Sequence, residues 1–190
     1  MGPENFGAEL RHKGPVVATI LGYHGCEKAF ADEVRSGHVT LAQWKPSQNR
    51  YDWLGEGIYF WEASRTRAEQ WAVEQFADDA DVLVMEVDLG ECLNLLESTY
   101  HDDLRATYRS VRARFRREGL TFPRNLGKCH DLDNLVINSF VRDMAQQGFR
   151  FQTGRGAFEE GRPLFPGSAM RRQSHIQIAV RNVHCLRIHE

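Results

Sequence analysis

The stretch VVATILGYHG, residues 16–25, decides how the rest of the chain is interpreted. Its first six residues are β-branched or aliphatic and lead to Gly22, a pattern that is typical of a buried strand ending in a turn. His24 follows, next to Gly25, whose lack of a side chain lets another group approach the backbone closely. We therefore expect a buried strand that presents an imidazole at the edge of a pocket, although a purely structural histidine gives the same pattern.

A second segment, GEGIYFWE at residues 55–62, places two glycines before an aromatic run. Glycine at Gly57 weakens a strand unless the backbone turns tightly or lies against a ligand. Tyr51 and Tyr59 belong to an aromatic group that could form a slot for a flat ring, with polar groups supplied by the loop around Asn49. A packed corner of the fold is the alternative. The spacing matches neither a P-loop nor a dinucleotide-binding fingerprint.

A third segment, SHIQIAV at residues 174–180, alternates as a strand does. Gln177 stands between two isoleucines, so it is either an edge residue in water or a polar group pointing into a cleft. Upstream, Glu159 and Glu160 are adjacent acids in a glycine- and arginine-rich segment, 149–173. They either cap a turn or face the same pocket.

These three segments, in this order, resemble the ADP-ribosyltransferase fold, specifically its His-Tyr-Glu branch, which includes diphtheria-type toxins and poly(ADP-ribose) polymerases. The resemblance covers residues 16–188 and sets His24, Tyr59 and Gln177 at the motif positions. It implies that NAD is the substrate. His24 would bind a ribose hydroxyl, the backbone of Gly25 would hold the nicotinamide carboxamide, and Tyr59 would stack on the nicotinamide ring.

The chain departs from the family pattern in ways that affect the expected reaction. Gln177 replaces the usual acid, and a carboxamide can form hydrogen bonds but cannot take a proton. The resemblance therefore implies mono-transfer rather than polymer synthesis, with Glu160 or its neighbour as a candidate base. Arg67 replaces the helix serine of the polymerases. Trp71 either fills the second stacking position or belongs to the core.

The expected fold class is α+β, because strands and helices mix without a regular βαβ rhythm. The resemblance implies a split antiparallel β-sheet core with flanking helices. We expect residues 1–15 to be a flexible tail and residues 16–190 to form a single catalytic domain. The patterns predict strands at 16–24, 58–61, 81–90 and within 174–188, and helices at 27–36, 63–77, 102–119 and 132–147.

Composition places the chain among ordinary globular proteins. The chain has 190 residues, of which 42% are hydrophobic and 26% are charged, and a formal net charge of −2. No stretch is apolar enough for a membrane span and no leader is recognised, so we expect a cytoplasmic protein with reduced cysteines. Cys129 and His130 lack a second pair at zinc-site spacing, so no metal is predicted.

Arginine is concentrated in one helix. Residues 105–124 hold seven arginines and one acid, Glu118, and several arginines recur at helical spacing, including Arg109, Arg112 and Arg116. Such a face can bind a phosphate backbone. It can also be a solvated face that pairs with the acidic stretch 78–103.

The expected function is that of a mono-ADP-ribosyltransferase that uses NAD and modifies a nucleic acid or a protein, with nucleic acid slightly favoured. By resemblance it would be a bacterial toxin or defence effector, and an antitoxin or immunity protein would be its partner. Two alternatives remain open: a catalytically weakened module that binds NAD or ADP-ribose, and an NAD glycohydrolase. No membrane partner is expected.

Overall fold

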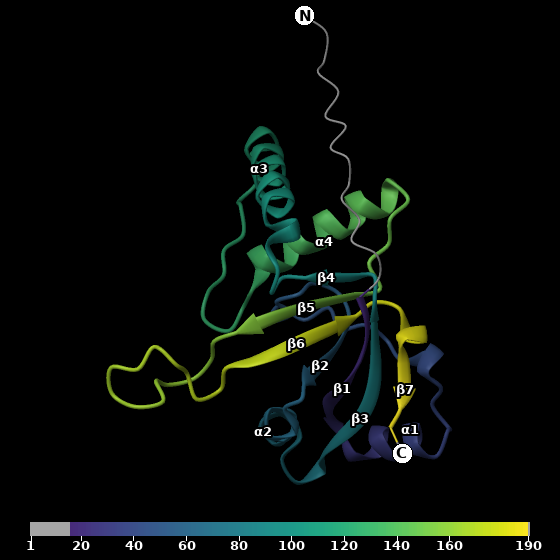
Figure 1. Ribbon diagram of the computed structural model, residues 1–190. Coiled ribbons are helices and arrows are strands. Elements are labelled where there is room, and N and C mark those ends of the chain that lie inside the picture. The colour runs from purple at the N-terminus through teal and green to yellow at the C-terminus, as the bar shows by residue number, and fades with distance from the viewer. Residues whose placement is uncertain (1–15, 190) are drawn as a thin grey trace, which may run out of the picture.

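The structure is a computed structural model that describes residues 16–189, so the expected tail at residues 1–15 lies outside the described residues. Seven strands form one sheet in the order β4-β5-β6-β2-β1-β3-β7 (Figure 1). The strands are β1 (Val16–Glu27), β2 (Ile58–Glu62), β3 (Ala80–Gly90), β4 (Cys92–Asn94), β5 (Thr153–Phe158), β6 (His175–Val180) and β7 (Leu186–Ile188). The helices are α1 (Lys28–Arg35), α2 (Arg65–Phe76), α3 (His101–Arg117) and α4 (Asp131–Gln146), joined by 3-10 turns.

The α+β class expected from the sequence is confirmed, but the sheet is mixed rather than wholly antiparallel. Strands β4 and β5 run parallel, and the remaining neighbours in the sheet are antiparallel. The physical reason is the connection: the chain between β4 and β5 passes through α3 and α4, and a long helical crossover returns the chain in its original direction. The expectation of an antiparallel sheet is therefore wrong at this edge.

The sheet narrows at its centre. Strand β1 pairs with β3 along nearly its whole length, but it pairs with β2 only through Gly22 opposite Glu62 and Tyr23 opposite Trp61. We call this two-pair junction the seam. It divides the sheet into one half made of β1, β3 and β7 and another made of β2, β6, β5 and β4.

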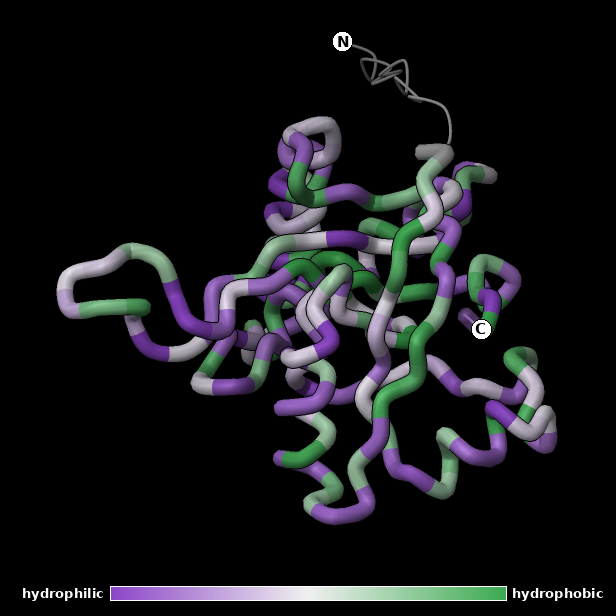
Figure 2. The backbone as a smooth tube through the Cα atoms, turned by 60° about the horizontal axis from the view of Figure 1, so that its bottom comes forward, coloured by the Kyte–Doolittle hydropathy of each residue, from purple (hydrophilic) through white to green (hydrophobic). Residues whose placement is uncertain are grey.

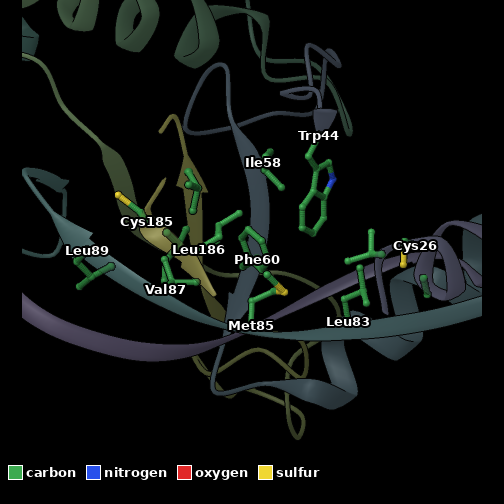
Figure 3. Packing of buried hydrophobic residues seen from close by; sticks show 14 of the residues in the cluster. Cys26, Trp44, Ile58, Phe60, Leu83, Met85, Val87, Leu89, Cys185 and Leu186 are labelled. Atoms are coloured by element: carbon green, nitrogen blue, oxygen red, sulfur yellow. The ribbon is translucent and has the colours of Figure 1, made fainter. Parts of the chain in front are cut away.

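The main hydrophobic core lies on one face of the sheet. Phe60, Met85 and Leu83 are fully buried there (Figure 3), and Ala31 and Val34 from α1 pack into the same cluster. Burial of these side chains stabilises the fold through the apolar area that is removed from water, roughly 25 cal/mol per Å². Both halves of the sheet contribute to this cluster, so the core spans the seam.

The other helices cover the rest of the sheet. Helix α2 packs Ala68 against Trp61 and Val82 in a small separate cluster. Helix α4 packs Ile137 and Phe140 against Leu93 of β4, while α3 extends away from the sheet (Figure 1). Within residues 16–189, no helix is both long and apolar enough to cross a membrane.

Strand β5 lies in the 149–173 segment, for which the sequence predicted no element. Glycine is rare in strand interiors, but here its lack of a side chain makes room for neighbours. A Cβ at Gly154 would lie 2.7 Å from the Arg181 guanidinium, and one at Gly156 would lie 3.1 Å from Leu54. Arg155 also has a partner in the fold, since its Nε lies 2.6 Å from Glu62.

Candidate active site

A cavity of about 890 Å³ lies at the seam, lined by residues of both halves of the sheet, the 44–53 loop, α2 and the loops before α4 and β6. That volume is near the upper end of the roughly 300–1,000 Å³ that is typical of small-molecule sites. The candidate site residues that line it are His24, Gly25, Asn49, Tyr51, Tyr59, Trp71, Glu160 and Gln177. Four others are not among its lining residues: Gly57, Arg109, Arg112 and Arg116.

His24 is held at the point where backbone pairing across the seam stops. Its Nδ1 lies 2.7 Å from the carbonyl oxygen of Tyr59, and its ring meets Trp44 edge-on. A carbonyl oxygen can only accept, so Nδ1 carries the proton, and Nε2 of a neutral ring is left as an acceptor. Burial lowers the pKa of His24 to about 4, while the bond to Tyr59 acts in the opposite direction. The ring is therefore neutral at physiological pH.

Tyr59 has its hydroxyl fully engaged by the turn that precedes β2. The hydroxyl donates to the carbonyl oxygen of Gly55 at 2.7 Å and accepts from the backbone N–H of Leu54 at 2.9 Å. Burial also raises the pKa of Tyr59 far above its usual range. The hydroxyl is therefore unsuited to act as an acid or base, and the ring is what Tyr59 offers to the cavity.

Gln177 presents an unpaired acceptor in the cavity wall. The residue is 9% exposed, and its Oε1 is buried without a hydrogen-bond partner in the described part of the chain. It lies opposite Trp61 in the sheet, so Gln177, Trp61 and Tyr59, two residues along β2, share one face. A buried acceptor left unsatisfied costs roughly 1–3 kcal/mol, a cost that a ligand donor would remove.

Glu160 enters the cavity from the loop before β6 and is held by α2. Its Oε2 accepts from Nη2 of Arg67 at 2.8 Å and lies 3.9 Å from Nδ1 of His175. His175 donates from that same Nδ1 to the carbonyl oxygen of Gln173, and burial lowers the pKa of His175. Arg67 thus orients one carboxylate oxygen in a cavity that lacks an acid on β6.

Glycine at position 25 is explained by helix packing. A Cβ there would lie 2.7 Å from the carbonyl oxygen of Ala68 and 3.0 Å from the Trp71 ring. Trp71 also packs against Trp61 and Phe76 while lining the cavity, so it combines the two roles that the sequence left open. The close approach of α2 to β1 forms one wall of the cavity.

The glycine at position 57 is explained by strand pairing, whereas the sequence led us to expect a ligand contact there. A Cβ there would lie 2.9 Å from the Cβ of Ala179, so the position serves the close pairing of β2 with β6. Asn49 and Tyr51 do line the cavity, and the Asn49 side chain donates to Ser47 at 2.8 Å. The polar loop and the aromatic slot are therefore in place without a ligand contact at Gly57.

Asp52, which no sequence motif indicated, lines the cavity and is only 2% exposed. Burial raises the pKa of Asp52 to about 6, although Ser47 and the backbone N–H of Asn49 donate to its carboxylate. An acid between two aromatic residues was the available signal. Its burial depends on contacts across the fold that no local pattern reveals.

His130 was considered only as a metal ligand, but the structure gives it another setting. Its ring stacks on Trp53 with 3.6 Å between ring centroids and lines the cavity. Residues 16–189 contain no group of three or more His, Cys, Asp or Glu side chains that could hold a metal ion. All four cysteines are free.

The basic helix lies outside the cavity. Arg109, Arg112 and Arg116 are exposed on α3, and Arg112 lies over the Tyr108 ring, 6.0 Å from its centroid. The chain that leaves α3 nevertheless returns to the site, because Gly127 and Lys128 line the cavity. The expected pairing with the acidic stretch involves Asp102, which pairs with Arg105 at 3.2 Å.

Comparison of the sequence with models of known protein families and with curated proteins gave no match.

Proposed function

We propose that this protein is a mono-ADP-ribosyltransferase with an ADP-ribosyltransferase-like fold. It would bind NAD in the cavity, cleave the bond between nicotinamide and ribose, and transfer ADP-ribose to a macromolecule. One observation carries the proposal: His24, Tyr59 and Gln177, which are far apart in the chain, line a single cavity at the seam of the sheet. Their order is that of the His-Tyr-Glu motif, with glutamine in the last place.

The lining residues fit a dinucleotide. NAD has flat rings and ribose hydroxyls, and the cavity offers many aromatic side chains, including Trp44, Trp53 and Trp71. Two acceptors stand ready for hydroxyl or amide donors: Nε2 of His24, whose other nitrogen is occupied, and Oε1 of Gln177, which has no partner in the described chain. A ligand that donates to both acceptors would satisfy the buried oxygen of Gln177.

The chemistry follows from what these residues can supply. When the glycosidic bond breaks, its electron pair leaves with nicotinamide and positive charge develops on the ribose. The amide oxygen of Gln177 carries a partial negative charge, which favours the positive charge on the ribose. The acceptor atom then bonds to the ribose carbon and loses a proton. We assign this proton to Glu160, which Arg67 holds in position in the cavity wall.

The role of the protein in the cell is proposed on the resemblance alone. Enzymes of this kind include toxins, so a toxin or defence effector neutralised by an antitoxin or immunity protein is the corresponding proposal. Labelling in a lysate, described next, tests the enzymatic part independently of any partner.

The experiment uses NAD labelled on its adenylate half, incubated with the pure protein and a whole-cell lysate. Tyr59→Ala removes the ring that faces the cavity, and Tyr108→Ala on α3 is the matched control. Transfer predicts label on macromolecules with the wild type and the control but not with Tyr59→Ala. Consumption of NAD without label would instead indicate an NAD glycohydrolase.

A second candidate function rests on Gln177. A module that binds NAD or ADP-ribose without chemistry would leave NAD bound and intact in the same experiment. Gln177→Glu separates the two cases: gain of NAD cleavage by an inactive wild type supports the module. An active wild type whose variant changes its choice of target supports a transferase adapted to glutamine.

A further inference from the structure

A hairpin stands beside the cavity mouth. Residues 160–173, here called the 160–173 hairpin, fold back on themselves through Leu164 N–H to Met170 O at 2.9 Å and Arg172 N–H to Arg162 O at 3.0 Å. Its base closes through Gln173 N–H to Glu160 O at 3.1 Å. Because Glu160, Gly161 and Gln173 line the cavity, the hairpin continues directly from the cavity wall. Figure 1 shows it projecting from the body of the molecule before β6.

The tip of the 160–173 hairpin is apolar and its stem is basic. Leu164, Phe165 and Met170 are 47%, 55% and 59% exposed, which is unusual for side chains of this size. Figure 2 shows the projecting loop with hydrophobic stretches beside a pale end, and hydrophilic stretches nearer the body. The three stem arginines, Arg162, Arg171 and Arg172, are exposed, and none forms an ion pair within residues 16–189.

The other side of the cavity mouth is basic as well. Lys128 lines the cavity, and the chain leading to it from α3 carries Arg124. Figure 1 shows this connection and the hairpin on the same side of the molecule. Further exposed arginines without an ion pair in the described chain continue the basic surface along α3: Arg109, Arg112, Arg114, Arg116 and Arg117.

Five acids line the cavity: Glu27, Asp52, Glu74, Glu159 and Glu160. Glu27 ends β1 and Glu74 lies on α2, away from the hairpin. Asp52 is buried and Glu160 is paired with Arg67, so Glu159 is the exposed acid beside the hairpin. The protein as a whole has a formal net charge of −2, so the cations near the hairpin and α3 form a local asymmetry rather than a general excess. A local basic surface attracts a polyanion to one side of the cavity.

We propose that the acceptor is a single-stranded nucleic acid that lies across the cavity mouth between the 160–173 hairpin and the 124–128 segment. This proposal rests on the proposed function. The stem arginines and Lys128 would contact phosphates, and Phe165 at the tip would stack on an unpaired base. Cationic grooves combined with exposed aromatic rings are the usual means of binding single strands, whereas a duplex keeps its bases stacked.

The arrangement also accounts for the transfer step. An unpaired nucleobase exposes nucleophilic nitrogen or oxygen atoms. Glu160, where the hairpin begins, lies in the cavity wall. A nitrogen or oxygen atom of the nucleobase bonds to the ribose carbon as nicotinamide leaves with the electron pair of the broken bond. The proton of that nucleobase atom passes to Glu160. The segment that binds the acceptor thus also carries the group that activates it.

The test measures binding of fluorescein-labelled 20-nucleotide single strands of mixed sequence, as DNA and as RNA, by fluorescence anisotropy over a salt series. Arg171→Glu/Arg172→Glu changes the hairpin stem, and Phe165→Ser changes its tip. Arg150→Glu/Arg187→Glu, with both sites exposed and outside the hairpin, is the charge-matched control. The same proteins are assayed for NAD binding and for transfer of labelled ADP-ribose to the oligonucleotides.

The proposal predicts that the affinity for the oligonucleotide decreases with salt and is about tenfold lower in the stem variant. The slope of log affinity against log salt should also be smaller by roughly 1.4 in that variant, because each phosphate contact on a single strand contributes about 0.7. The control variant should bind like the wild type, and NAD affinity should stay unchanged throughout. Labelling of an oligonucleotide that is lost in the stem variant and in Phe165→Ser also supports the proposal. Comparison of the DNA and RNA oligonucleotides shows which nucleic acid is modified.

Other outcomes overturn the proposal in distinguishable ways. If lysate protein is labelled in a Tyr59-dependent manner while oligonucleotides neither bind nor become labelled, the proposed function stands and the nucleic-acid acceptor is wrong. Equal affinity of the stem and control variants contradicts the placement on the hairpin. If oligonucleotides bind through the hairpin but NAD is never cleaved, the surface is supported and the transferase fails.

Discussion

The Nδ1 atom of His24 lies 2.7 Å from the carbonyl oxygen of Tyr59, across the seam where strands β1 and β2 cease to pair. The imidazole therefore takes the place of a backbone donor and links two motif residues that are 35 positions apart. The same bond determines which ring nitrogen faces a ligand as an acceptor.

Replacing that acceptor should weaken NAD binding. We expect His24→Ala to raise the Kd for NAD about 10- to 100-fold, because a ligand donor left without its partner costs roughly 1–3 kcal/mol. Isothermal titration calorimetry measures the change. His184→Ala, at an exposed histidine of the turn before β7, is the control. A Kd for His24→Ala within twofold of the wild type would show that His24 is structural.

Glu160 is expected to act on the acceptor rather than on NAD. Glu160→Gln keeps the shape and can still accept from Arg67, but it cannot take a proton. Transfer should fall about 10²- to 10⁴-fold, as for loss of a general base, while the Kd for NAD changes little. Glu33→Gln, at an exposed acid of α1 that does not line the cavity, provides the matched control. Equal activity of the two variants would rule out Glu160 as the base.

Gln177 should show opposite effects on stability and activity. Gln177→Met replaces a buried amide whose oxygen has no partner in the described chain by an apolar side chain of similar length. We expect the free energy of unfolding to rise by about 1 kcal/mol and NAD cleavage to fall at least about tenfold. Urea denaturation and an NAD-consumption assay measure the two quantities. A loss of both stability and activity would mean that the amide is needed for the fold.

The pH dependence of stability should reveal two opposed groups in the cavity. Asp52 has a folded pKa of about 6, above its ordinary value, so the folded protein holds its proton more tightly and stability falls as pH rises from about 4 to 6. His24 has a folded pKa of about 4, below its ordinary value, so stability rises with pH from about 4 to 6.5.

Asp52→Asn removes the first of these opposed effects. The free energy of unfolding of the variant should therefore increase with pH between 4 and 6 more steeply than that of the wild type, by up to about 1.4 kcal/mol per pH unit. Urea denaturation at several pH values in this window tests it. Parallel pH profiles for the two proteins would show that Asp52 titrates as it does in an unfolded chain.

Gly25→Ala should destabilise the protein through helix α2. The added Cβ would meet the carbonyl oxygen of Ala68, a backbone atom that moves only with the helix. Overpacking of this kind costs roughly 1–3 kcal/mol. Gly119→Ala is the comparison, since a Cβ there has nothing within 4 Å and only the left-handed backbone, at a φ of 65°, opposes it. An unfolding temperature of Gly25→Ala that is equal to or higher than that of Gly119→Ala would contradict the packing argument.

The elements that were predicted well are those with strong periodicity. Helix α3 and strand β3 lie within a residue or two of the predicted ranges, because their apolar positions follow helix and strand spacing. Strand β5 was missed because its glycines are there for Arg181 and Leu54, which approach it from elsewhere in the chain. Its identity as a strand depends on tertiary neighbours rather than on its own residues.

Some residues of the candidate site could also be predicted from local sequence patterns, and others could not. His24, Tyr59 and Gln177 could be found because each lies in a strand with a readable motif. Asp52 and the stacked pair of Trp53 and His130 could not, since their burial depends on the 44–53 loop meeting the start of α4. Gly57, expected to contact a ligand, is not among the residues that line the cavity, and its close approach to Ala179 explains the glycine.

The narrow seam has a consequence for the mechanics of the molecule. Only two residue pairs join β1 to β2, and side-chain packing supplies further connections between the halves. The main core spans the seam, and so does the smaller cluster in which α2 packs on Trp61 and Val82. A ligand bound by His24 on one side and by Tyr59 and Gln177 on the other would bridge the two halves of the sheet across the seam. Ligand binding and association of the two halves of the sheet are then linked, so that a bound ligand stabilises the folded sheet across the seam.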